Sequence, residues 1–123
     1  MRVIAGSAKG ARLFGPSGNS RAVRPTSDRT KSILFDTLLS LTSLPKVTLD
    51  LFAGTGALGI EALSRGSDRA VFVDQSKQAI GYIKKNLEKT RLVDSSKVVC
   101  LDAIRFLKQQ NEAYELILAD PPY

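Results

Sequence analysis

A glycine-rich turn that joins an apolar run to a helical pattern constrains this chain more than any other feature of its sequence. The apolar run covers residues 47–52 and the helical pattern covers residues 57–65. Gly54, Gly56 and Gly59 between and within them satisfy the spacing G-x-G-x-x-G. Such a turn brings the backbone amides at the start of a helix close to a bound ligand. The pattern therefore predicts an α/β domain with a ligand site at this turn.

The chain from residue 47 onward repeats this alternation of short apolar runs and helical patterns, which is typical of a parallel sheet flanked by helices. We expect four strands, at residues 47–52, 70–73, 97–101 and 114–119. We expect three helices between them, at residues 57–65, 76–89 and 103–110. Gly66 and Ser76 have the residue types that end one helix and cap the next. The expected fold is Rossmann-like, and the sequence stops directly after its fourth strand, which indicates truncation and an uncovered strand edge.

Two further elements are expected before the first strand. Thr26 or Ser27 can cap a helix whose apolar residues recur at helical spacing as far as Leu41, and Pro45 stops the pattern. Residues 2–5 and 11–14 lie on either side of a glycine-flanked turn and predict a β-hairpin. We therefore divide the chain into an N-terminal arm, residues 1–25, and a core, residues 26–123.

The net charge of +6 is concentrated at the N-terminal end of the chain. Residues 1–31 contain one acidic residue, Asp28, and seven basic ones: Arg2, Lys9, Arg12, Arg21, Arg24, Arg29 and Lys31. The remaining residues carry equal numbers of basic and acidic side chains. A basic arm on a neutral domain is suited to a nucleic-acid backbone, because neutralising phosphates releases counterions. The predicted RNA contacts are Arg2, Lys9, Arg12, Arg21, Arg24 and Arg29.

Composition excludes several kinds of chemistry. The chain has no histidine and a single cysteine, so intrachain disulfides, histidine metal sites and Ser/Cys–His catalysis are excluded, and we expect no metal. Cys100 falls in the third apolar run, where we expect a small buried core residue. The sequence has neither a signal-peptide core nor the run of about 20 apolar residues that a membrane span needs, so a cytoplasmic location is expected.

Acidic residues at the ends of the first two strands suggest which ligand the turn binds. Asp74 lies 20 residues beyond Gly54, where a carboxylate can accept hydrogen bonds from ribose hydroxyls. Asp50 would repel a pyrophosphate, whereas it would attract the cationic ammonium and sulfonium groups of S-adenosylmethionine. Asp50 therefore favours S-adenosylmethionine over NAD, although an NAD-dependent oxidoreductase stays open as an alternative. Asp50 could also serve only as an acceptor for amides of the turn.

Two further acidic positions follow the third and fourth strands. Asp102 could bind an adenine amino group, with Ala103 beside the ring, or could cap the helix that begins at Ala103. Asp120 is followed by Pro121, Pro122 and Tyr123. The Asp120 carboxylate and the Pro121 carbonyl could accept both N–H bonds of an exocyclic amine and so direct its lone pair at a methyl donor. Tyr123 could stack on the base.

The chain resembles the RsmD-type family of small-subunit ribosomal RNA guanine-N2 methyltransferases. The resemblance rests on four segments: residues 2–6 with Lys9-Gly10, residues 24–29, residues 50–66 and residues 120–123. It implies a class I methyltransferase that moves a methyl group from S-adenosylmethionine to guanine N2 in 16S rRNA, with rRNA or the small-subunit particle as partner. Asp74 departs from the family, which usually has Glu there, and family members continue beyond the fourth strand. A non-catalytic RNA-binding fragment is therefore a second alternative.

The resemblance also implies a set of functional residues. The catalytic residues are Asp120, Pro121, Pro122 and Tyr123. The cofactor-binding residues come from the glycine turn and the strand ends: Asp50, Phe52, Ala53, Gly54, Gly56, Asp74, Gln75, Asp102 and Ala103. The basic arm supplies the RNA contacts.

Overall fold

The computed structural model describes residues 1–16 and 27–121 of the 123-residue chain. Its strands form one parallel sheet in the order β3-β2-β1-β4. The strand bounds are Val47–Leu51 (β1), Arg69–Asp74 (β2), Ser96–Cys100 (β3) and Leu116–Ala119 (β4). The helices are Asp28–Leu41 (α1), Ala57–Arg65 (α2), Lys77–Thr90 (α3) and Ala103–Gln109 (α4), with a short 3-10 helix at Val93–Ser95 (η1). The predicted Rossmann-like α/β fold is confirmed.

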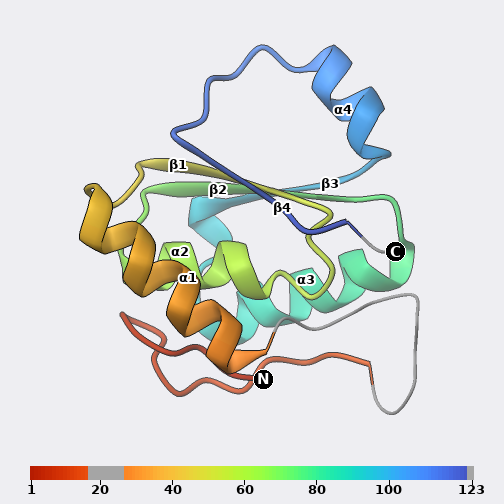
Figure 1. Ribbon diagram of the computed structural model, residues 1–123. Coiled ribbons are helices and arrows are strands. Elements are labelled where there is room, and N and C mark those ends of the chain that lie inside the picture. Colours follow the sequence, from red (N-terminus) through yellow and green to blue (C-terminus); the bar gives the residue numbers. More distant parts are fainter. Residues whose placement is uncertain (17–26, 122–123) are drawn as a thin grey trace.

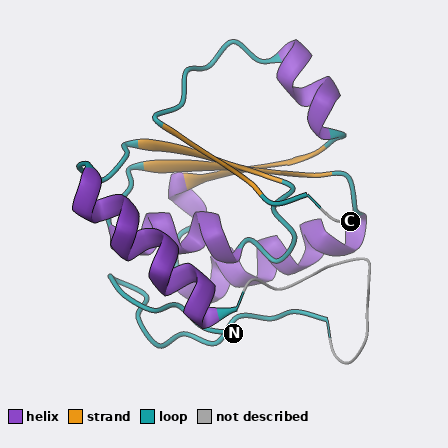
Figure 2. Ribbon diagram, in the orientation of Figure 1, coloured by secondary structure: helices purple, strands orange, loops and turns teal. Residues whose placement is uncertain are grey.

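Helices cover both faces of the sheet (Figure 1, Figure 2). Helices α1, α2 and α3 lie on one face, and α4 lies on the other. Ala70 and Phe72 of β2 belong to the core beneath α2 and α3, whereas Val71 and Val73 belong to the core beneath α4. Successive side chains of a strand point to opposite faces, so a strand covered on both faces needs apolar residues throughout. This explains the continuous apolar run in β2.

The predicted helix caps are present at three helix ends. Ser27 caps α1 and Ser76 caps α3, and each side chain accepts a hydrogen bond from an amide three residues further on, at 3.1 and 3.2 Å. Gly66 ends α2 with φ +121°, a conformation that L side chains rarely adopt. The last strand is shorter than predicted, because it begins at Leu116 rather than at residue 114.

The predicted N-terminal hairpin is only partly correct. Its two segments meet in a single antiparallel bridge, between Arg2 and Arg12, rather than in a ladder. The amides of Ile4 and Ala5 donate instead to the carboxylate of Glu61 on α2, at 2.9 and 3.1 Å. The two segments still share backbone hydrogen bonds, from the Val3 amide to Ala11 at 2.9 Å and from the Leu13 amide to Met1 at 3.0 Å. The arm therefore pairs with itself near its start and with helix α2 at Ile4 and Ala5.

The two edge strands carry exposed residues at opposite sides of the sheet. Ile117 of β4 is 54% exposed, and among the strands of the described residues β4 pairs with β1 alone. The prediction for Cys100 is wrong, because this residue is exposed rather than buried. Cys100 is the last residue of β3, the other edge strand, and within residues 1–16 and 27–121 no further strand pairs with β3 on its outer side. An apolar run alone does not distinguish an edge strand from a central one.

Candidate functional site

The carboxyl ends of all four strands meet at one edge of the sheet, since the strands are parallel (Figure 1). In the strand register Leu51 lies between Val73 and Ala119, and Asp74 lies opposite Cys100. The predicted acidic residues therefore gather at this edge. They are Asp50 near the end of β1, Asp74 at the end of β2, Asp102 after β3 and Asp120 after β4.

The glycine turn between β1 and α2 has an unusual backbone. Gly54 and Gly56 have φ values of +61° and +83°, which explains the need for glycine at both positions. Phe52 has φ +61° as well, although it carries a side chain, and its residue surface is 36% exposed. Non-glycine residues with positive φ are uncommon and gather at ligand sites. The neighbouring Ala53 is buried, and its amide donates to the Val73 carbonyl at 2.9 Å.

The third glycine of the motif has a different role. A Cβ atom at Gly59 would lie 2.4 Å from the ring of Phe72 on β2. Only a residue without a side chain allows α2 to pack this closely on the sheet. Gly59 therefore sets the distance between the helix and the strand, as the motif predicts.

Asp50 is buried beside the glycine turn and is hydrogen-bonded to the start of helix α2. Its side chain accepts a hydrogen bond from the Gly59 amide at 3.0 Å, and the residue is 2% exposed. Burial raises the pKa of Asp50 to about 8; the Gly59 bond opposes this rise, and the charges of Asp74 and Asp120 add to it. The Asp50 carboxyl is thus largely protonated at neutral pH, and a nearby cation would favour its ionised form. The expected bond to an amide of the turn is present, and it leaves the other carboxylate oxygen for a ligand.

Asp74, the last residue of β2, binds the glycine turn through its carboxylate. One carboxylate oxygen accepts the Gly54 amide and the other accepts the Ser76 amide, both at 2.9 Å. Each carboxylate oxygen has a second lone pair, so these bonds leave capacity for the hydroxyls of a ribose. Gln75 is exposed beside it, and its carbonyl lies 3.7 Å from the Cys100 sulfur.

The remaining predicted site residues differ in how far the structure describes them. Asp102 caps α4 and lies 3.4 Å from the amide of Arg105, so the expected capping role is present, and Ala103 is buried. Asp120 is exposed at the end of β4, next to the half-buried Pro121. Pro122 and Tyr123 lie outside the described residues.

Four of the six predicted RNA-binding residues are described, and Arg2, Lys9, Arg12 and Arg29 are all exposed. Arg21 and Arg24 lie outside the described residues. Arg2 and Arg12 face each other across the antiparallel bridge and line a cavity of about 440 Å³ with Met1, Leu13 and Asp28. Asp28 accepts the Arg2 amide at 3.0 Å and lies 3.7 Å from its guanidinium, so it offsets part of this charge.

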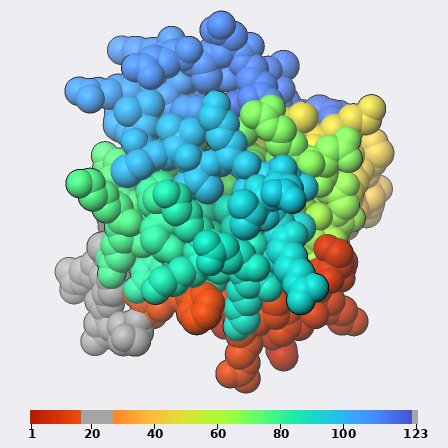
Figure 3. Space-filling view, turned by 180° about the vertical axis from the view of Figure 1, so that it is seen from behind, coloured from red at the N-terminus to blue at the C-terminus, as the bar shows by residue number. Residues whose placement is uncertain are grey.

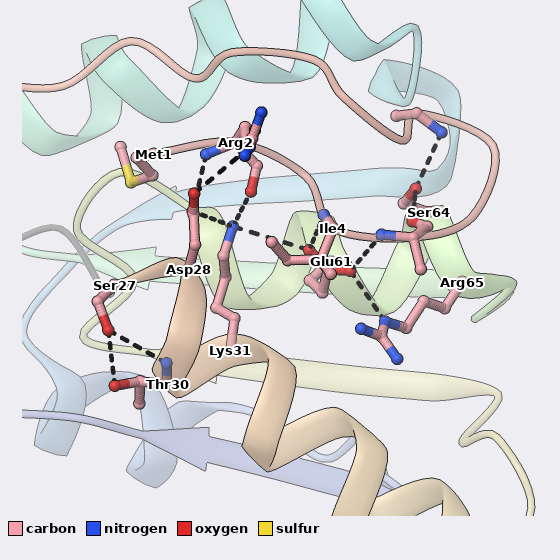
Figure 4. Close-up of polar contacts among 12 residues, drawn as sticks. Met1, Arg2, Ile4, Ser27, Asp28, Thr30, Lys31, Glu61, Ser64 and Arg65 are labelled. Atoms are coloured by element: carbon pink, nitrogen blue, oxygen red, sulfur yellow. Dashed lines mark hydrogen bonds and ion pairs between the residues drawn. The ribbon is translucent and has the colours of Figure 1, made fainter.

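Lys31 is one of the seven basic residues counted in residues 1–31, yet it lies in the interior of the protein. Its side chain is fully buried and lies 3.7 Å from Glu61 and 3.9 Å from Asp28 (Figure 4). The Lys31 ammonium also donates to the carbonyl of Arg2. Burial lowers the pKa of Lys31, although both carboxylates act in the opposite direction. Counting charges along the sequence could not reveal this pairing, because Glu61 lies on a different helix.

Glu61 is the centre of this buried network. Besides Lys31 and the amides of Ile4 and Ala5, it accepts a hydrogen bond from Arg65 at 2.8 Å (Figure 4). The whole side chain of Glu61 is inaccessible to solvent. The network thus fixes the arm to α1 and α2 through buried charged groups.

Within residues 1–16 and 27–121, no group of three or more histidine, cysteine or acidic residues could hold a metal ion. The same part of the chain has no helix of the length and apolarity that crossing a membrane requires.

A model of one protein family, described as "Conserved hypothetical protein 95", matches residues 1–123. The chain is 41% identical over 126 residues to the Bacillus subtilis protein YlbH, and the match covers 100% of the chain and 67% of YlbH. It is 37% identical to "Ribosomal RNA small subunit methyltransferase D" of Haemophilus influenzae, covering 100% of the chain and 64% of that protein. The solved structure of Escherichia coli yhhF superposes with a TM-score of 0.84 at 34% identity, covering 100% of the chain and 65% of yhhF. The chain thus spans about two thirds of the length of these relatives.

Proposed function

Because the chain belongs to the RsmD-type family, whose model is described as "Conserved hypothetical protein 95", we propose that it is the cofactor-binding part of an rRNA methyltransferase. The cofactor would be S-adenosylmethionine and the acceptor would be the exocyclic N2 of a guanine in small-subunit rRNA. This proposal locates the protein in the cytoplasm, with rRNA or the small-subunit particle as its partner. The name of the Haemophilus influenzae relative supports the choice of rRNA.

The buried Asp50 beside the glycine turn is the observation that carries this proposal. A dinucleotide would bring a pyrophosphate to the amides of this turn, next to the Asp74 carboxylate and next to Asp50, whose ionisation is already opposed by burial and by the charges of Asp74 and Asp120. The ammonium of a methionine moiety would instead relieve that repulsion. Asp74 and Gln75 at the end of β2 would contact the ribose, and Asp102 with Ala103 would contact the adenine.

S-Adenosylmethionine supplies an electrophilic methyl group on a positively charged sulfur. The chain would then act by positioning its acceptor rather than through a covalent intermediate. Asp120 and the carbonyl of Pro121 would accept the two N–H bonds of the guanine amine and direct its lone pair at the methyl carbon. Transfer would form the N–C bond as the S–C bond breaks, and the nitrogen would then release one proton to the Asp120 carboxylate or to solvent. Pro122 and Tyr123 complete the proposed acceptor site, with Tyr123 stacking on the base.

Calorimetric titration with S-adenosylhomocysteine, the demethylated product, tests the proposed cofactor directly. NAD serves as the parallel ligand under the same conditions. Saturable binding of S-adenosylhomocysteine without binding of NAD is the expected result. Binding of NAD alone would overturn the proposal in favour of an oxidoreductase. RNA binding without either ligand would indicate a non-catalytic RNA-binding protein.

We expect S-adenosylhomocysteine to slow the chemical modification of Cys100 severalfold. The Cys100 thiol is exposed and lies opposite Asp74 in the strand register, at the edge where the ribose would bind. A bound ligand would therefore restrict the access of a thiol reagent. The rate of thiol modification is measured with and without ligand, and NAD at equal concentration is the control. An equal rate in saturating S-adenosylhomocysteine would place the ribose elsewhere.

Asp120→Ala is expected to lower methyl transfer by about 100-fold or more in a protein of full family length, while S-adenosylhomocysteine affinity stays within about twofold. The alanine removes the acceptor that would direct the amine but leaves the turn intact. Single-turnover transfer of a labelled methyl group gives the first quantity, and calorimetry gives the second. Near-normal turnover in this variant would remove Asp120 from the catalytic residues.

Arg12→Ala is expected to weaken RNA binding and to reduce the salt dependence of the binding constant by about one phosphate contact, a change of about 0.7–0.9 in the logarithmic slope. Arg12 is exposed on the arm. Lys108→Ala is the matched control, because Lys108 lies on α4 at the opposite face of the sheet. The slope is measured by RNA titration over a range of salt concentrations. Equal slopes for both variants would exclude Arg12 from the interface.

A further inference from the structure

The side chain of Asn86 joins the N-terminal arm to the glycine turn. Asn86 lies on α3 and is fully buried. Its Oδ1 accepts the Phe14 amide at 2.6 Å, and its Nδ2 donates to the carbonyls of Phe14 and Thr55, both at 2.9 Å. Phe14 is 72 residues and Thr55 is 31 residues away in sequence. All three bonds go to backbone groups, so one amide holds two distant chain segments at once.

Side-chain packing supports the same link between the arm and the turn. The sulfur of Met1 lies 3.5 Å from the hydroxyl of Thr55, and a Cβ atom at Gly15 would lie 3.3 Å from the Thr55 methyl group. Leu13 of the arm and Ala53 of the turn belong to one buried cluster. The space-filling view shows the arm, in red, directly against the green and teal atoms of the α3 region (Figure 3). Residues of the arm are therefore in direct contact with residues of the turn.

The arm segment that Asn86 holds presents a charged and aromatic surface. Arg12 is exposed, and the Phe14 residue surface is 47% exposed. The Lys89 ammonium of α3 lies 4.9 Å from the centre of the Phe14 ring. Cations beside an exposed aromatic ring are typical of surfaces that bind single-stranded nucleic acid. Asn86 therefore lies between the proposed cofactor site and the proposed RNA site.

We propose that Asn86 is a positioning residue that couples cofactor binding at the glycine turn to the conformation of the arm, so that cofactor and RNA strengthen each other's binding. This inference rests on the proposed function. A ligand that orders the turn through Thr55 also orders Phe14 through the same amide, and a partner on the arm acts in the reverse direction. Thermodynamic linkage requires the two effects on affinity to be equal.

Hydrogen–deuterium exchange of the unmodified chain tests the coupling without any variant. The Phe14 amide donates to Asn86, so its exchange reports the state of this link. Saturating S-adenosylhomocysteine should slow this exchange severalfold. Ligand binding with an unchanged rate at Phe14 would overturn this inference alone. A complete lack of S-adenosylhomocysteine binding would overturn the proposed cofactor and the inference with it.

Asn86→Leu removes all three hydrogen bonds and keeps the number and branching of the side-chain heavy atoms. We expect S-adenosylhomocysteine affinity to fall about tenfold, which equals about 1.4 kcal/mol, and the ligand effect on Phe14 exchange to disappear. Thr90→Val is the matched control, because this buried hydroxyl lies on the same helix and donates within it, to the carbonyls of Asn86 and Leu87. Its affinity should stay within about twofold of the unmodified chain. Equal losses in both variants would mean that Asn86 acts only through general stability, and if the leucine variant does not fold, the exchange experiment decides.

Discussion

Glu61→Leu is expected to lower the free energy of unfolding by about 3–5 kcal/mol, because it leaves the buried Lys31 without its main partner. The side chains of both residues are inaccessible to solvent, and their charged atoms lie 3.7 Å apart. Removing the carboxylate also strips the amides of Ile4 and Ala5 of their acceptor. A loss of this size is a large part of the stability of a small domain.

Chemical denaturation of three variants separates the pair from its surroundings. Glu88→Leu is the surface control, since Glu88 is exposed on α3, and it should change stability by no more than about 0.5 kcal/mol. The double variant Lys31→Met with Glu61→Leu should recover part of the loss, because an apolar pair leaves no buried charge. If the Glu61→Leu variant is as stable as the unmodified chain, water reaches Lys31 once the Glu61 carboxylate is gone.

The sequence predicts the order of helices and strands because the signals for these elements are local. The glycine turn, the alternation of apolar runs and the caps Ser27 and Ser76 each involve residues only a few positions apart. Because the strands run parallel, the acidic residues at their carboxyl ends meet at one edge of the sheet, and this predicts a shared site for them. This is why Asp50 and Asp74 could be placed beside the turn from sequence alone.

The features that the sequence did not predict depend on partners distant in sequence. Ile4 departs from the expected hairpin because it pairs with Glu61, 57 residues away, and the buried Lys31 pairs with the same carboxylate. Cys100 is exposed because strand order, not composition, makes β3 an edge. The positive φ of Phe52 has no clear signature in its residue type.

Asn86 did leave a signal in the sequence. It occupies an inward position in the pattern of buried residues on α3, together with Ala79, Ile83 and Leu87. A polar side chain at such a position requires hydrogen-bonding partners, since an unpaired buried amide is destabilising. The pattern could therefore have marked Asn86 as a connecting residue, although it could not have identified Phe14 and Thr55 as the partners.

The affinity for S-adenosylhomocysteine is expected to rise with pH between about 6 and 7.5, by up to about tenfold per unit, and Asp50→Asn should abolish this rise. Asp50 has a pKa of about 8, so most of its carboxyl groups are protonated below that pH. The ligand ammonium favours the ionised carboxylate, and binding must therefore release a proton. Asparagine keeps an oxygen acceptor for the Gly59 amide and removes only the charge. Calorimetry at several pH values measures both chains.

The stability of the unliganded protein gives an independent measure of the same group. The folded pKa of about 8 lies above the ordinary value of 3.8, so the contribution of Asp50 to stability is fully present below about pH 4 and is lost as pH rises to 8. The loss amounts to at most about 1.4 kcal/mol per pH unit, and Asp50→Asn should remove it. If the variant loses this pH dependence of stability yet binds S-adenosylhomocysteine like the unmodified chain, Asp50 serves the turn alone. If the pH dependence of stability and the pH dependence of binding both disappear in the variant, the cofactor ammonium binds the ionised Asp50 carboxylate, which is unfavourable in the unliganded protein.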